Sequence, residues 1–271
     1  MNSAVNEAIL ALTDQGRLNA ISCMTTMKML TPDAKRLQEA IARAAHKIEI
    51  GLHLTFTEYS SITGVSSLEQ NGKLPEISKL LIKAHLRQLD QKEIIKEITA
   101  QFTKFEETFG QKPDFVDGHQ HVHILPVIRN ALFTVAKKHL PKEGWMRFCY
   151  QPTASILKTG ISLPRSLLIS NLSRPMRGLI KDNNIKSNDL FLGINDFNQR
   201  DNYRQQMQHW LKLANDHLGE TLIMCHPGLE PNTNSSIIDP IENRRPDEFQ
   251  YLASDEFIED LASNNLTLNK T

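Results

Sequence analysis

The chain has 271 residues, which suffices for one large α/β domain, and no linker or repeat divides it, so we expect a single domain over residues 1–271. Its 31 basic and 31 acidic residues balance, which leaves no charged surface for nucleic acid or an anionic membrane. No apolar run reaches the roughly 18 residues of a membrane span and no signal-peptide pattern opens the chain, so we expect a cytoplasmic protein.

Short apolar runs alternate with longer amphipathic stretches along the chain. In chain order we expect a helix over Ser3–Asp14, a strand over Leu18–Thr25, a helix over Pro32–His46, a strand over Ile48–Thr57, a helix over Lys92–Phe109, a strand over Phe115–His119, a helix over Pro126–His139, a strand over Trp145–Cys149, a helix over Tyr203–His217 and a strand over Thr221–Cys225. Strands separated by helices pair in parallel. The fold class is therefore predicted as α/β and (β/α) barrel-like, a relative of the TIM barrel, with a doubly wound open sheet as the alternative.

The first predicted element is a helix without a strand before it. Val5, Ile9 and Leu12 recur near the helical period, and Asn2 or Ser3 can cap the start of the helix. In a βα alternation each helix follows a strand, so the pattern predicts a barrel that lacks its first strand. A fold that simply begins with a helix is the alternative.

The stretch Tyr59–Asp90 shows no clear period and is predicted to be a long insertion between the second strand and the helix that follows it. Loops at the carboxyl ends of strands often cover an active site. A surface excursion without function is an equal alternative.

Three histidines and one aspartate alternate in the run Asp117-Gly118-His119-Gln120-His121-Val122-His123. On an extended backbone these four side chains would share one face. Imidazole is the commonest metal ligand, and a nearby carboxylate can orient its ring. Four titratable groups also make a poor core, so the run predicts a functional site rather than a solvated, histidine-rich turn.

Two further histidines follow apolar strands. His53 lies in Gly51-Leu52-His53-Leu54, and His226 lies in Met224-Cys225-His226-Pro227-Gly228. A lone histidine among apolar residues is usually a core residue. Because barrels gather the carboxyl ends of their strands around one pocket, we expect His53, His119 and His226 to converge there.

Two other features have less specific interpretations. Arg147, inside a predicted strand, either holds substrate or pairs with an acid in the barrel. The charged cluster Asn243–Glu248 is predicted to be a solvated surface turn. The scattered Cys23, Cys149 and Cys225 are expected to be free thiols.

Several motifs together resemble the YdjC/ChbG carbohydrate deacetylases. They are G-L-H-L at Gly51–Leu54, D-G-H-Q-H-V-H at Asp117–His123, M-C-H-P-G at Met224–Gly228, N-E-A-I at Asn6–Ile9 and the Arg-x-x-Glu and Leu-x-Ser elements of Arg245–Ser254. The resemblance covers nearly the whole chain. It implies a barrel-like fold and metal-dependent removal of an acetyl group from an N-acetylated sugar such as a chito-oligosaccharide.

The resemblance also implies roles for individual residues. His53 and His119 match the ligands of one divalent ion, Mg²⁺ or Zn²⁺, and His226 matches the catalytic residue that protonates the leaving amine. His121 and His123 match positions that support the ligands or contact the substrate, and Arg147 is the third expected substrate-binding residue. Members of the family often form homodimers.

One family motif has no counterpart in this chain. Relatives begin with a strand ending in Ala-Asp-Asp-Phe-Gly, which supplies a metal ligand and a base, whereas here Met1 falls where that motif ends. We therefore expect a late start codon and impaired activity, and an in-frame Ala-Asp-Asp segment upstream would confirm it. The alternatives are a non-catalytic sugar-binding protein with a degenerate deacetylase fold and an unrelated metal hydrolase.

Overall fold

The computed structural model describes residues 3–27, 30–198, 202–230 and 239–268. Short strands alternate with helices along most of its length. In chain order the elements are α1 (Ser3–Asp14), β1 (Ala20–Cys23), α2 (Leu30–Arg43), β2 (Glu49–Leu54), α3 (Ile77–His85), α4 (Gln91–Phe109), β3 (Phe115–Gly118), the 3-10 helix η1 (His119–Ile124), α5 (Ile128–His139), β4 (Trp145–Met146), α6 (Thr153–Thr159), α7 (Leu163–Ser173), α8 (Met176–Asn183), β5 (Leu190–Leu192), α9 (Tyr203–Asn215), β6 (Thr221–Ile223), the 3-10 helix η2 (Glu242–Arg244), α10 (Arg245–Ala253) and α11 (Asp255–Ser263).

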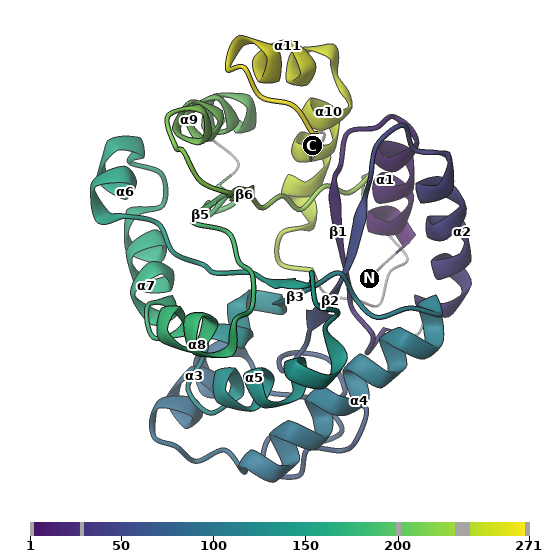
Figure 1. The fold of residues 1–271 in the computed structure, drawn as a ribbon, viewed down its shortest axis with the longest axis vertical. Coiled ribbons are helices and arrows are strands. Elements are labelled where there is room, and N and C mark those ends of the chain that lie inside the picture. Colours follow the sequence, from purple (N-terminus) through teal and green to yellow (C-terminus); the bar gives the residue numbers. More distant parts are fainter. Residues whose placement is uncertain (1–2, 28–29, 199–201, 231–238, 269–271) are drawn as a thin grey trace.

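The strands lie at the centre and all of their pairings are parallel. One sheet has the order β1-β2-β3-β4, and β5 pairs with β6 in a second. In Figure 1 the helices surround these strands, with α1 and α2 beside β1, α4 and α5 below, α7 and α8 at the left and α9 to α11 at the top. The predicted barrel-like α/β fold is confirmed, although the described strands do not close into a barrel.

The segment after β4 connects the two sheets. Arg147 N–H donates to the Val116 carbonyl of β3 at 3.1 Å, and Phe191 N–H of β5 donates to the Tyr150 carbonyl at 2.9 Å. Side chains alternate along this extended segment, so Arg147 and Cys149 are buried on its inner side. The carboxyl ends of the strands therefore open toward a common region.

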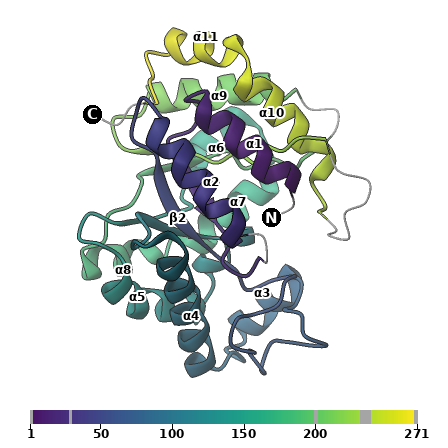
Figure 2. The ribbon, with the colours of Figure 1, turned by 90° about the vertical axis from the view of Figure 1, so that its right-hand side faces the viewer.

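Local sequence explains the helix boundaries. Asp90 caps α4 by accepting hydrogen bonds from the Lys92 and Glu93 N–H groups, and Gly110 ends the helix with a φ of 68°. The predicted helix Ser3–Asp14 has those bounds in the structure, and it packs against α2 and α10 (Figure 2). No helix in the described ranges combines the length and the hydrophobicity that a membrane span requires.

The stretch Tyr59–Asp90 contains the short helix α3, which the sequence did not predict. The loop before α3 is fastened to α4 by Glu97, whose side chain is fully buried. Glu97 carboxylate oxygens accept hydrogen bonds from the backbone N–H groups of Ile62 at 3.0 Å and Thr63 at 2.8 Å. The insertion is therefore a fixed part of the fold, and its role at the site stays a prediction.

Gly51 lies where two strands leave no room for a side chain. It faces the Phe115 ring, which stacks on Trp145 with ring centroids 4.3 Å apart, and a Cβ at Gly51 would lie 2.4 Å from that ring. We expect Gly51→Ala to lower the free energy of unfolding by about 1–3 kcal/mol, because the stacked rings must move.

Urea denaturation measures the change, and Gly178→Ala in α8 is the matched control. Nothing lies within 4 Å of a Cβ at Gly178, so alanine should stabilise that helix by about 1 kcal/mol. Equal stability of the Gly51→Ala variant and the unmodified chain would contradict the contact.

Candidate active site

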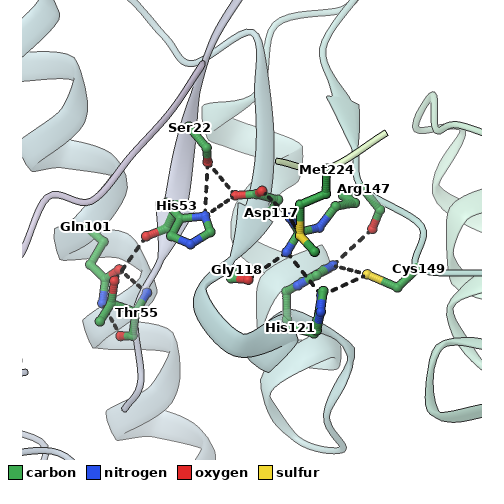
Figure 3. A network of polar contacts seen from close by, with 11 residues as sticks. Ser22, His53, Thr55, Gln101, Asp117, Gly118, His121, Arg147, Cys149 and Met224 are labelled. Carbon is green, nitrogen blue, oxygen red and sulfur yellow. Dashed lines mark hydrogen bonds and ion pairs between the residues drawn. The ribbon is translucent and has the colours of Figure 1, made fainter. Parts of the chain in front are cut away.

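One carboxylate joins three strands at the centre of the site (Figure 3). Asp117 Oδ1 accepts hydrogen bonds from Ser22 Oγ at 2.5 Å and from His53 Nδ1 at 2.7 Å. Asp117 Oδ2 forms an ion pair with Arg147 Nη1 at 2.6 Å. The register places His53 directly opposite Asp117, so the parallel pairing of β2 and β3 sets this contact.

The ion pair decides the charge of these groups. Burial alone would raise the pKa of Asp117, but the Arg147 guanidinium and His53 outweigh it and hold this pKa well below its usual range. Burial also lowers the pKa of His53, so the ring is neutral at neutral pH. Because His53 Nδ1–H donates to Asp117, the lone pair of His53 lies on Nε2, where it can bind a ligand.

The prediction that Asp117, His119, His121 and His123 share one face is wrong. The strand ends at Gly118 and the chain continues as a 3-10 turn, in which Gln120 and His121 have left-handed φ angles of 49° and 59°. The turn directs the histidines apart, because it replaces the period of two of a strand. Alternation in the sequence therefore predicted the wrong geometry for this run, and its function stays a prediction.

The structure brings His119 and His53 together. Their ring centroids are 5.7 Å apart, and Tyr59 packs on the other side of His119 at the same separation. His119 Nε2 lies 3.3 Å from a carboxylate oxygen of Glu58. Both histidines are partly exposed, so their rings line the site rather than the core.

Glu58 belongs to the site although the sequence analysis did not select it. It has a left-handed φ of 66°, and its Oε1 accepts a hydrogen bond from Gln120 Nε2 at 2.8 Å. The hydrogen bond from His119 lowers the pKa of Glu58, which is therefore ionised at neutral pH. The available signal was its position shortly after β2, where barrels carry functional residues.

His121, His123 and Arg147 lie on the inner side of the turn. Arg147 Nη2 donates to the Gly118 carbonyl at 2.6 Å and lies 3.4 Å from His121 Nδ1. His123 is fully buried and bonds the Arg147 carbonyl through Nε2 at 3.0 Å. Of the two interpretations of Arg147, the structure shows the ion pair with Asp117, and contacts of these three residues with substrate stay predictions.

His226 follows β6, and its ring packs against Phe197 with ring centroids 5.3 Å apart. Burial lowers its pKa well below the usual value, and the positive charges of Arg245 and Arg147 lower it further. His226 Nδ1 is buried without a hydrogen-bond partner among the described residues. Met224 connects the same segment to the centre, since its sulfur lies 3.6 Å from Arg147 Nη1.

The prediction that Asn243–Glu248 is a solvated surface turn is wrong. Arg244, Arg245 and Glu248 are 8%, 6% and 2% exposed. They are buried because η2 and the start of α10 pack against the segment that carries His226, where the backbone has no strand partner. The many charged residues in this stretch predicted exposure to solvent, but these side chains bond to backbone groups and to one another.

A metal ion needs more ligands than this part of the chain supplies. His53 and His119 offer two partly exposed imidazoles, but no group of three or more His, Cys, Asp or Glu residues in the described ranges could hold an ion. Asp117 is occupied by Ser22, His53 and Arg147. The described residues therefore do not form a complete metal site by themselves.

The Asp117–Arg147 pair can be tested by substitution. Asp117→Asn keeps the shape but leaves the buried Arg147 guanidinium without its counter-charge, so we expect a loss of about 3–5 kcal/mol in the free energy of unfolding. Asp14→Asn is the control, because Asp14 pairs with Arg43 at 2.7 Å on the surface, where such pairs contribute about 1 kcal/mol or less. Equal losses in the two variants would contradict the central role of the pair.

Acid should destabilise the protein through His123. Burial lowers the pKa of His123 to about 3, whereas a histidine in an unfolded chain titrates near ~6.5. Between these values only the unfolded state takes up the proton, so the free energy of unfolding falls as pH decreases, by about 1.4 kcal/mol per pH unit. In urea titrations from pH 7 to pH 4, His123→Gln should remove the contribution of one proton from the dependence of the free energy of unfolding on pH. An unchanged dependence would be evidence against the role of His123.

Part of the chain is similar in sequence to curated proteins from Yersinia. A chitooligosaccharide deacetylase from Yersinia enterocolitica is 38% identical over 96 residues, which are 35% of this chain and 37% of that protein. A chitooligosaccharide deacetylase from Yersinia pestis is 33% identical over 125 residues, which are 45% of this chain and 48% of that protein. The chain thus matches less than half the length of these curated relatives.

A solved structure and a family model cover far more of the chain. The crystal structure of a proposed cellobiose-phosphate cleavage protein from Enterococcus faecalis V583 has a TM-score of 0.70, over 99% of this chain and 92% of that one. The two sequences are 18% identical, so this likeness shows the fold alone. The model of the YdjC-like proteins matches residues 1–263, and the chain therefore belongs to the YdjC-like protein family.

Proposed function

We propose that this protein is a carbohydrate N-deacetylase, a hydrolase that removes the acetyl group from an N-acetylated sugar. The observation that carries the proposal is the pairing of His53 and His119, whose ring centroids are 5.7 Å apart. His226 follows a third strand, and Met224 of the same segment contacts Arg147. Family membership and the names of the two Yersinia relatives support the reaction and favour a chito-oligosaccharide as substrate.

His226 is the proposed proton carrier. Its pKa is lowered, so the imidazole is neutral at neutral pH and can first accept the proton of the attacking water. Water adds to the acetyl carbon and the bond from that carbon to nitrogen breaks. His226 then returns the proton to the departing amine, so the products are acetate and the free amino sugar.

The remaining groups have supporting roles in this proposal. Asp117 fixes the ring of His53, and Glu58 with Tyr59 forms the opposite wall around His119. A carboxylate and an aromatic ring suit the hydroxyl groups and the apolar face of a sugar. Contacts of the sugar with His121, His123 or Arg147 remain part of the proposal.

A divalent ion is a separate proposal. His53 and His119 are the two described residues that would hold it, and a further ligand would have to come from outside the described set. Titration calorimetry with Mg²⁺ and with Zn²⁺, on the chain and on His53→Ala, tests it. Equal heats for both proteins would contradict a site built on His53.

Acetate release from N,N′-diacetylchitobiose tests the proposed reaction. We expect His226→Ala to lower kcat by about 10²–10⁴, the usual contribution of a positioned acid or base, with a smaller effect on KM. His209→Ala is the control, because His209 is exposed on α9 and bonds only the Gln205 carbonyl of its own helix among the contacts described.

The outcomes distinguish two functions. Acetate release that falls in His226→Ala and not in His209→Ala supports the deacetylase. Calorimetric binding of the sugar without acetate release would instead identify a sugar-binding protein with a deacetylase fold. Neither binding nor release would contradict both.

A further inference from the structure

The backbone of His226 is held by two side chains from a single helix. Glu248 Oε2 accepts a hydrogen bond from the His226 N–H at 2.5 Å, and Arg245 Nη1 donates to the His226 carbonyl at 3.1 Å. Arg245 and Glu248 are three residues apart at the start of α10, so they lie on one side of that helix. Both backbone polar groups of this residue are thus satisfied from outside its own sheet.

This arrangement is needed because strand pairing ends before His226. The last strand-like backbone bond runs from Met224 N–H to the Leu192 carbonyl at 3.0 Å, and Pro227 has no N–H to donate. A buried backbone group without a partner costs about 1–3 kcal/mol. The conformation at His226 therefore depends on α10 rather than on β5.

Arg245 is itself immobilised. Its Nε donates to Asp239 Oδ2 at 2.6 Å, and its carbonyl accepts from the Gly228 N–H at 3.1 Å. A Cβ at Gly228 would lie 2.9 Å from Arg245 Cβ, so the two backbones approach as closely as glycine permits. The segment from His226 to Gly228 is consequently held at three points by the first turn of α10.

Burying a carboxylic acid for this purpose is costly. Glu248 is 2% exposed, and burial raises its pKa to about 7 although Arg245 and the His226 N–H favour the ionised form. A neutral side chain or water could satisfy the same backbone group at lower cost. Acidic groups with such raised pKa values concentrate at functional sites, which favours a role connected with His226.

We propose that Arg245 and Glu248 are positioning residues that fix the direction of the His226 imidazole. They do not touch the reacting atoms, and they act through the His226 backbone. Their effect on the reaction rests on the proposed function, whereas their effect on the ring does not. A displacement of about 1 Å at a reacting group can cost about 10²-fold in rate, which is the size of effect expected here.

The test uses the full chain with isotope-labelled histidine. The ¹⁵N resonances of His226, assigned with His226→Ala, are followed as a function of pH in Glu248→Ala, Glu248→Gln and Asp247→Asn. Asp247 is the control because it lies in the same turn, is 47% exposed and pairs with Arg244 rather than with His226. The kcat and KM of each variant for diacetylchitobiose are measured in parallel.

We expect Glu248→Ala to shift the His226 resonances and to lower kcat by about 10²-fold with little change in KM. Glu248→Gln keeps an oxygen acceptor and should restore most of both signals, and Asp247→Asn should change neither. In a His226→Ala background, Glu248→Ala should cause no further loss of kcat, because the two residues act as one unit.

Unchanged His226 resonances in a folded Glu248→Ala variant would overturn the proposal, as would additive losses in the double variant. If Glu248→Ala does not fold, Arg245→Lys carries the test, because it removes the Nη1 donor to the His226 carbonyl, and normal His226 resonances in Arg245→Lys would overturn the proposal. Shifted resonances in a chain without deacetylase activity would support the positioning role and refute the proposed function, so the two failures are distinguishable.

Discussion

The site depends on the buried pair of Asp117 and Arg147. The carboxylate of Asp117 forms an ion pair with Arg147 and accepts hydrogen bonds from His53 and Ser22. Residues from β1, β2, β3 and the segment after β4 therefore meet at one side chain. Two charges placed this deep are stable only as a pair, because removing either one leaves the other buried and unpaired. That requirement fixes how the strands lie relative to one another, and the imidazole of His53 takes its direction from it.

Much of the fold could be predicted because its signals are periodic. The helix Ser3–Asp14 and the strands around Ile50, Val116 and Leu222 have patterns long enough to recognise. β5 was not predicted from the sequence, and α6 to α8 lie in a stretch where helical periods are brief. The barrel-like arrangement could be predicted from the alternation of strands and helices, because this alternation is recognisable even when individual elements are not predicted.

Candidate site residues could be selected from the sequence, but their arrangement could not. His53, His119 and His226 were selected because each lies at or just after the end of an apolar strand, and parallel strands end on one side. The left-handed turn at Gln120 and His121 could not be foreseen, since neither is a glycine. Glu58 and Glu248 were not assigned to the site from the sequence for a related reason. An acidic residue is expected on the surface unless the groups that donate hydrogen bonds to it are known.

Glu97 has a consequence for the mobility of the loop before α3. Its buried carboxylate binds the backbone of Ile62 and Thr63, and Gln101, one turn further along α4, binds Thr55 just after β2. Moving the loop outward would break these hydrogen bonds, at a cost of several kcal/mol. Opened forms of this loop are therefore rare, and the amides of Ile62 and Thr63 exchange slowly with solvent. The loop before α3 behaves as a rigid part of the fold rather than as a hinged flap.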